Sequence, residues 1–139
     1  MAPNCFSISR DGSMAVAGHS GKISCIDTNS FTVSKTCTAD YNVFDIEWGD
    51  GDWCCYTAGG DYGDSEYCIR KYTGNDYTFI NKYSYDGIFP VTVNGTTVQC
   101  PAHAQYIFTD RQETEAIVIK NAVYDNIPFA WSIEHVQLN

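Results

Sequence analysis

Basic residues are scarce in this sequence of 139 residues. Lys and Arg together number 8, against 17 for Asp and Glu, which gives a formal net charge of −9. Nucleic acids are bound by surfaces that neutralise phosphates, and anionic membranes attract basic clusters. The charge balance therefore speaks against nucleic acid and against a membrane as partners.

Long apolar runs are also absent. The longest uninterrupted apolar stretches reach only about four positions, as at 14–17 and 116–119, whereas a membrane-spanning helix needs roughly 18. No basic segment followed by an apolar stretch opens the sequence, so we expect no secretory signal peptide. These features favour a cytoplasmic protein, or one assembled into a particle or fibre.

The seven cysteines lack the spacing of metal or redox sites. No two of them form a Cys-x-x-Cys pair, so zinc-ribbon and thioredoxin-type sites are not expected. Their odd number favours reduced thiols packed as small apolar side chains. Three disulfides with one thiol left over remain the alternative in an oxidising compartment. Because neighbours on a strand point to opposite faces, only one of Cys54 and Cys55 is expected to be buried.

Signatures of catalysis are missing as well. The sequence has no Gly-x-Ser-x-Gly motif, no His-Glu-x-x-His motif and no glycine-rich loop opening a helix, which are marks of several hydrolase and phosphate-binding classes. The three histidines, at 19, 103 and 135, are far apart in the sequence. We therefore expect no enzyme, and the one catalytic hypothesis left is a carboxylate pair such as Asp50 and Asp61.

The sequence does contain many short runs, most of them alternating between apolar and polar residues, separated by Gly, Asp and Asn. The first four runs lie at 5–9, 14–17, 22–27 and 31–35. Such alternation is typical of half-buried strands, and tight turns join antiparallel neighbours. The first 35 residues therefore predict a four-stranded antiparallel meander with almost no helix.

The pattern recurs with a period near 40 residues. Phe6-Ser7-Ile8 is followed by Phe44-Asp45-Ile46 at the same place in a second set of four runs, and a weaker third set follows. A period of this length with several strands per unit indicates a repeat. We predict one all-β domain covering 1–139, with repeat units at 4–40, 41–86 and 87–139.

Four motifs of the first unit stand in a fixed order: the turn Ser9-Arg10-Asp11-Gly12, a small-residue run ending at Gly18, the turn Gly21-Lys22-Ile23 and the pair Ile26-Asp27. In this order they resemble a blade of the WD40-like and related β-propeller repeats, and the resemblance extends over 4–85. It implies four-stranded antiparallel sheets packed face to face around an axis.

The sequence departs from that family in three respects. It has no Trp-Asp dipeptide, no Gly-His pair opening a blade, and only three units, whereas a closed ring takes about four to eight blades. Three outcomes stay open: two chains completing a six-bladed ring, a segment of a larger propeller, or a single β-sandwich or barrel.

Two acidic turns flank the run 53–58 and form the candidate metal site. Their carboxylates are Asp50, Asp52, Asp61, Asp64 and Glu66. Oxygen-only clusters suit calcium, although the spacing matches no EF-hand loop. Ordinary Asp and Gly turn chemistry explains the same residues. Calcium is thus the one cofactor considered, and none is otherwise expected.

Aromatic residues make up 14% of the chain and include 10 tyrosines. Tyr and Trp supply large contact areas at protein interfaces and sugar-binding surfaces, and they also form cross-strand pairs inside sheets. The candidate partner-binding residues are Trp48, Trp53, Tyr62, Tyr67, Tyr72, Tyr77 and Tyr83.

These observations predict a non-enzymatic structural or protein-binding module. It would self-associate, or dock another protein, through an aromatic-rich β surface, as a virion or fibre component does. The alternative is a lectin-like module that binds carbohydrate, with or without calcium. Because a net charge of −9 opposes association at low salt, any oligomer is expected to tighten with added salt or a divalent cation.

Overall fold

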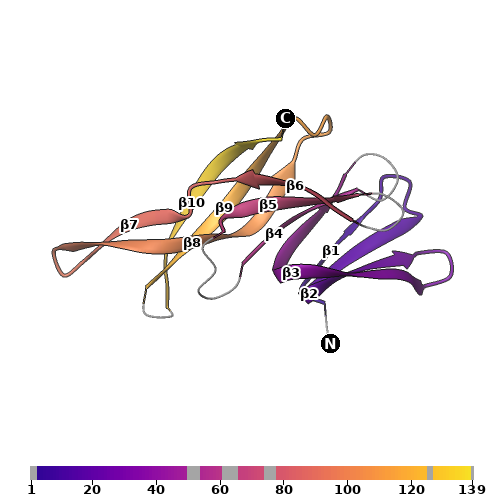
Figure 1. The fold of residues 1–139 in the computed structure, drawn as a ribbon, viewed down its shortest axis with the longest axis horizontal. Coiled ribbons are helices and arrows are strands. Elements are labelled where there is room, and N and C mark those ends of the chain that lie inside the picture. Colours follow the sequence, from indigo (N-terminus) through magenta and orange to yellow (C-terminus); the bar gives the residue numbers. More distant parts are fainter. Residues whose placement is uncertain (1–2, 50–53, 61–65, 74–77, 125–126, 139) are drawn as a thin grey trace.

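The computed structural model describes residues 3–49, 54–60, 66–73, 78–124 and 127–138, and it contains strands and no helix within them (Figure 1). The expected all-β, antiparallel fold is confirmed. Within these residues no helix is long and apolar enough to cross a membrane. The strands are β1 (Cys5–Ile8), β2 (Met14–Asp27), β3 (Thr32–Trp48), β4 (Cys55–Gly59), β5 (Cys68–Thr73), β6 (Thr78–Ser84), β7 (Ile88–Val93), β8 (Thr96–Thr109), β9 (Glu115–Tyr124) and β10 (Ile127–Gln137).

β2 folds back on itself in the middle. The N–H of Thr28 donates to the carbonyl of Ser13 (3.0 Å), although a straight strand of this length would hold its ends about 45 Å apart. Gly21, near the midpoint, has φ of 70°, a left-handed conformation that glycine adopts without strain. The runs predicted at 14–17 and 22–27 are therefore the two arms of a hairpin.

This fold-back completes the four-stranded meander predicted for the first unit. β1 pairs with the first arm of β2, from Cys5 opposite Gly18 to Ile8 opposite Ala15. The second arm pairs with the start of β3, from Lys22 opposite Thr38 onward. We call this four-stranded group the first layer.

β3 then changes partner and leads into the second layer. Its residues up to Asn42 pair with β2, and from Val43 onward it pairs with β4. β4, β5 and β6 continue the antiparallel order.

β8 is divided in the same way. Its first half pairs with β7 around a two-residue turn at Asn94 and Gly95, whose φ angles are 50° and 78°, as a primed hairpin turn requires. This hairpin extends away from the rest of the molecule (Figure 1). The second half of β8, from residue 102, pairs with β9, and β9 pairs with β10. These three segments form the third layer.

The second layer is buried on both faces. Tyr56 and Ile69 belong to an apolar cluster shared with β8, β9 and β10, whereas Cys55 and Tyr72 belong to a cluster shared with β2 and β3. Both Cys54 and Cys55 are consequently buried. The expectation that only one of them would be buried was wrong, because it assumed a sheet with one solvent-exposed face.

All seven cysteines are free thiols, five of them buried and two half-buried. They pack as small apolar side chains, as the sequence predicts. Burial raises the pKa of Cys5 and of Cys25 to about 11 and that of Cys54 to about 12. These thiols therefore stay protonated and weakly nucleophilic at neutral pH.

Candidate functional site

Three of the tyrosines predicted to bind a partner, Tyr67, Tyr72 and Tyr83, lie inside the fold. Tyr72 is 2% exposed and packs between the first and second layers. Tyr67 and Tyr83 are half-buried against the cluster between the second and third layers, and Tyr67 stacks on His103 with ring centroids 4.7 Å apart. These three rings therefore do not form an exposed face, because the layer that carries them is covered on both sides.

Two more of the predicted partner and metal residues lie in the described part of the chain. Trp48 is half-buried and lines the cleft described below. Glu66 is exposed and forms ion pairs with Lys82 (2.6 Å) and Arg70 (3.1 Å). The hydrogen bond from Lys82 lowers the pKa of Glu66. Glu66 thus serves as a salt-bridge residue on the β5–β6 side of the sheet.

The other predicted residues lie outside the described part of the chain. They are Asp50, Asp52, Trp53, Asp61, Tyr62, Asp64 and Tyr77. Among the residues that the structure does describe, no group of three or more His, Cys, Asp or Glu side chains is placed to hold a metal ion.

The exposed aromatic surface lies on the third layer instead. On β9 the even-numbered residues from Ala116 to Ala122 are buried, whereas Ile117 is exposed and Ile119 half-buried, so these two side chains point away from the core. Tyr106 lies opposite Ile119 on β8 and β9, and Ile119 lies opposite Ile133 on β10. This register places side chains of the three strands in rows across one face.

We call this surface the outer apolar face. Its members are Tyr106, Phe108, Ile117, Ile119, Trp131 and Ile133. Ile133 is 68% exposed, Trp131 55%, Phe108 53% and Tyr106 49%, and the rings of Tyr106 and Trp131 stack with centroids 6.3 Å apart. No described strand packs over this face.

The sequence contained a signal for this face that tyrosine density concealed. In the run 116–119 every residue is apolar, so both faces of the strand are apolar and not only one. A strand of this kind is buried on both sides or presents an apolar surface to solvent. On β10 the apolar Trp131 and Ile133 alternate with the polar Ser132 and Glu134.

The opposite end of the stack presents a second apolar surface, which we call the β1 face. Phe6 and Ile8 of β1 lie opposite Ala17 and Ala15 of β2. The register of the β2 hairpin places these alanines opposite Ser24 and Ile26, which in turn pair with Thr36 and Val33. Phe6 is 69% exposed and Val33 61%.

Small residues form the centre of the β1 face. Ala15, Ala17 and Ser24 lie between the larger side chains of β1 and β3. His19 Nε2 and Ser24 Oγ are 3.0 Å apart, and Ser24 Oγ is 3.2 Å from Thr36 Oγ1. The polar atoms of this face are thus hydrogen-bonded to one another, which lowers the cost of covering it.

A cleft of about 220 Å³ lies where β1, β3 and β8 end side by side. The N–H of Trp48 donates to Ser7 Oγ (3.0 Å), and the Arg10 guanidinium donates to the carbonyl of Arg111 (3.2 Å). Burial, followed by the charge of Asp45, raises the pKa of Glu47. The cleft is lined by Ser7, Ile8, Arg10, Glu47, Trp48, Gly49, Thr109, Asp110, Arg111 and Glu113.

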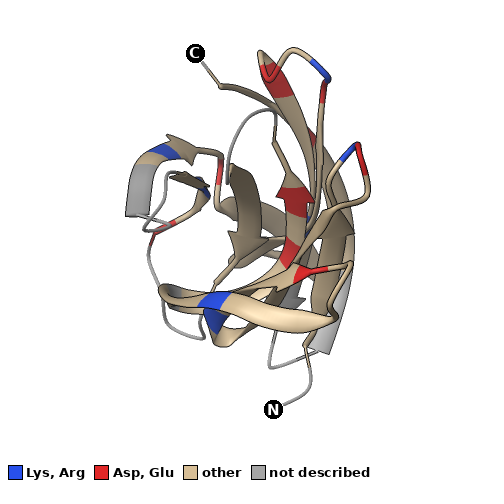
Figure 2. Cartoon of the chain, turned by 90° about the vertical axis from the view of Figure 1, so that its right-hand side faces the viewer, with Lys and Arg blue, Asp and Glu red and all other residues tan. Residues whose placement is uncertain are grey.

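Among the described residues, the charged ones are spread over several elements in the view of Figure 2. Figure 2 shows acidic segments on several loops and strand ends, with the fewer Lys and Arg segments set among them. None of the six residues of the outer apolar face is charged. The face is therefore set apart by its apolar character and not by its electrostatics.

Comparisons with known proteins address the fold. No family model matches the chain, and no curated protein matches its sequence. A solved structure of hydrazine synthase from Kuenenia stuttgartiensis is similar, with a TM-score of 0.73 and 10% sequence identity. The match covers 99% of this chain and 34% of that one. At this identity the likeness shows a shared fold, and this chain spans about a third of the length of its structural neighbour.

Proposed function

We propose that the protein is a non-enzymatic structural module that associates with further copies of itself through the outer apolar face. The observation that carries the proposal is the row of Tyr106, Trp131 and Ile133, which lies uncovered by any described strand. Large contiguous apolar patches on folded domains mark interaction sites. Association through such a face suits a component of a particle or fibre.

The size of the face supports a protein partner. Aromatic side chains span about 150–250 Å² each, and those of the face are about half exposed. With its isoleucines, the face presents on the order of 450 Å² of apolar surface. A standard interface covers about 800 Å² on each side and is roughly 57–65% apolar, so it needs about 450–520 Å² of such surface. The face is therefore large enough for a stable contact.

Sedimentation over a range of protein concentrations tests this proposal. We expect the wild type to form dimers or larger species, and Ile133→Glu to be monomeric because it would bury an uncompensated carboxylate. Thr97→Glu on the β7–β8 hairpin is the matched control, since Thr97 is also an exposed strand residue. A wild type that stays monomeric at every concentration and salt level would refute the proposal.

The cleft supports carbohydrate binding as a second candidate function. Trp48 provides an aromatic surface for the apolar side of a sugar ring, and the surrounding carboxylates and guanidiniums suit its hydroxyl groups. A glycan array with wild type and Trp48→Ala tests this function. Binding that is lost in Trp48→Ala but kept in Ile133→Glu would support it, and a wild type that binds no glycan would exclude it.

A further inference from the structure

We infer that the outer apolar face of one copy packs on the β1 face of another, so that copies join head to tail. This inference rests on the proposed self-association and specifies its geometry. The competing geometry is two-fold pairing, in which the outer apolar face meets the same face of a second copy.

The layers inside one chain already stack head to tail. The second layer presents one face to the first layer through Cys55 and Tyr72, and its opposite face to the third layer through Tyr56 and Ile69. Successive layers therefore meet through unlike faces. At the two ends of this stack, the β1 face of the first layer and the outer apolar face of the third layer have no described neighbour.

The shapes of the two end faces favour contact with each other. In the cluster between the second and third layers, the large Tyr56 packs in a group with Ala104 and Ala116. The end faces differ in the same sense, because one carries large exposed rings such as Trp131, and on the other the exposed Phe6 flanks small residues such as Ala17, which is itself only 3% exposed. Large side chains set against small ones reach the packing density of a protein interior.

Two-fold pairing offers no such fit. It would set a face of large side chains, among them Tyr106, Phe108 and Trp131, against a second face of the same kind. It would also leave Phe6 and Val33, which are 69% and 61% exposed, uncovered in the assembly. Head-to-tail contact covers both end faces with one type of junction.

A head-to-tail contact has a consequence for the size of the assembly. Each copy offers one face of each kind, so contacts of this type either close into a ring or continue as a filament. Each chain supplies three layers, and rings of stacked sheets typically hold about four to eight. Two copies, with six layers and two identical junctions, are therefore the expected closed assembly.

Mixing two single-face variants tests the geometry. Phe6→Glu disables the β1 face, and Ile133→Glu disables the outer apolar face. Each variant alone should be monomeric, with an affinity about 100-fold or more below that of the wild type. The two variants mixed should form a heterodimer, because one junction then joins two intact faces. Native mass measurement with one variant isotopically labelled detects this species.

Each outcome separates the inference from the proposed function. If Phe6→Glu dimerises like the wild type while Ile133→Glu does not, the contact is two-fold and the head-to-tail inference fails, although self-association stands. If Ile133→Glu dimerises, or if the wild type is monomeric, the proposed function fails as well. Val33→Glu serves as a second variant of the β1 face should Phe6→Glu not fold, and Thr97→Glu is the control that keeps both faces.

Discussion

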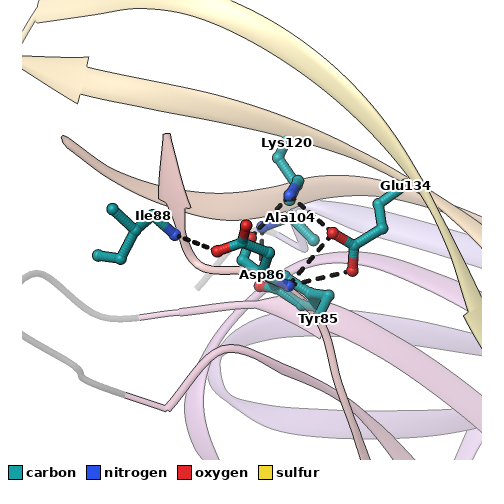
Figure 3. A network of polar contacts seen from close by, with 6 residues as sticks. All are labelled: Tyr85, Asp86, Ile88, Ala104, Lys120 and Glu134. Atoms are coloured by element: carbon teal, nitrogen blue, oxygen red, sulfur yellow. Dashed lines mark hydrogen bonds and ion pairs between the residues drawn. The ribbon is translucent and has the colours of Figure 1, made fainter. Parts of the chain in front are cut away.

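Glu134→Ala should destabilise the fold by about 2–3 kcal/mol, because it removes the anionic partner of a buried lysine. Lys120 lies on the inner side of the third layer with only 6% of its side chain exposed, and its Nζ is 3.1 Å from Glu134 Oε1. Nζ also donates to the carbonyl of Asp86 (2.7 Å). Figure 3 shows that these contacts fasten the segment after β6 to β9 and β10.

The magnitude follows from what the substitution leaves behind. Breaking a fully buried ion pair costs about 3–5 kcal/mol, since the remaining charge has no counterion. Glu134 is 28% exposed on its side chain, so water reaches the site and lowers that cost. The exposed N–H of Asp86, which donates to both Glu134 oxygens at 3.2 and 3.0 Å, also loses its acceptor. About 2–3 kcal/mol remains, or roughly 7–10 °C in Tm for a chain of this size.

Urea denaturation followed by circular dichroism measures this change. Wild type and variant are compared at one protein concentration, because association contributes to apparent stability. The double variant Lys120→Met with Glu134→Ala should recover most of the loss, since no buried charge is then left without a partner. A loss below about 0.5 kcal/mol in Glu134→Ala, or no recovery in the double variant, would refute the reasoning.

Three further predictions concern buried positions. In Gly87→Ala the new Cβ would lie 1.8 Å from the Tyr67 ring, so we expect a loss of about 2 kcal/mol or more in the same urea assay; an unchanged midpoint would contradict the packing. Cys54, with a pKa of about 12 from burial, should react with iodoacetamide at pH 8 only after unfolding, and rapid labelling of the folded protein would show that it is accessible. Burial raises the pKa of Asp45. The charged form of Asp45 therefore lowers stability at neutral pH, and this loss becomes smaller as the pH falls through that pKa. The stability of Asp45→Asn relative to the wild type should therefore be highest at pH 7. A resonance titration of Asp45→Asn should also give Glu47 a lower pKa than in the wild type, because the Asp45 charge raises that pKa. An unchanged pKa of Glu47 would exclude this coupling.

The strands and their turns could be predicted from the sequence because both are set by neighbouring residues. The short runs at 14–17 and 22–27 identified two strands, and the glycine at 21 supplied the left-handed turn between them. Asn94 and Gly95 likewise specified a two-residue hairpin. Local chemistry of this kind does not depend on how the sheets pack together.

The exposed surface could not be placed in the same way, because burial depends on the stacking of layers. Tyr72 and Trp131 both stand on alternating strands, but one lies in the covered middle layer and the other on an end layer. The alternation on these two strands does not distinguish the two environments. The interpretation of Tyr67, Tyr72 and Tyr83 as binding residues therefore exposed to solvent three side chains that pack between the layers.

Fluorescence of Trp131 gives the most direct test that the outer apolar face is covered by another copy. The chain has 3 tryptophans, so replacing Trp48 and Trp53 by Phe leaves Trp131 as the only source of tryptophan emission. Its ring is 55% exposed in the single chain, and its emission should shift to shorter wavelength as protein concentration rises and the face is buried. The shift should vanish when Ile133→Glu is added. Emission that stays at the position of an exposed tryptophan while the protein dimerises would contradict the account.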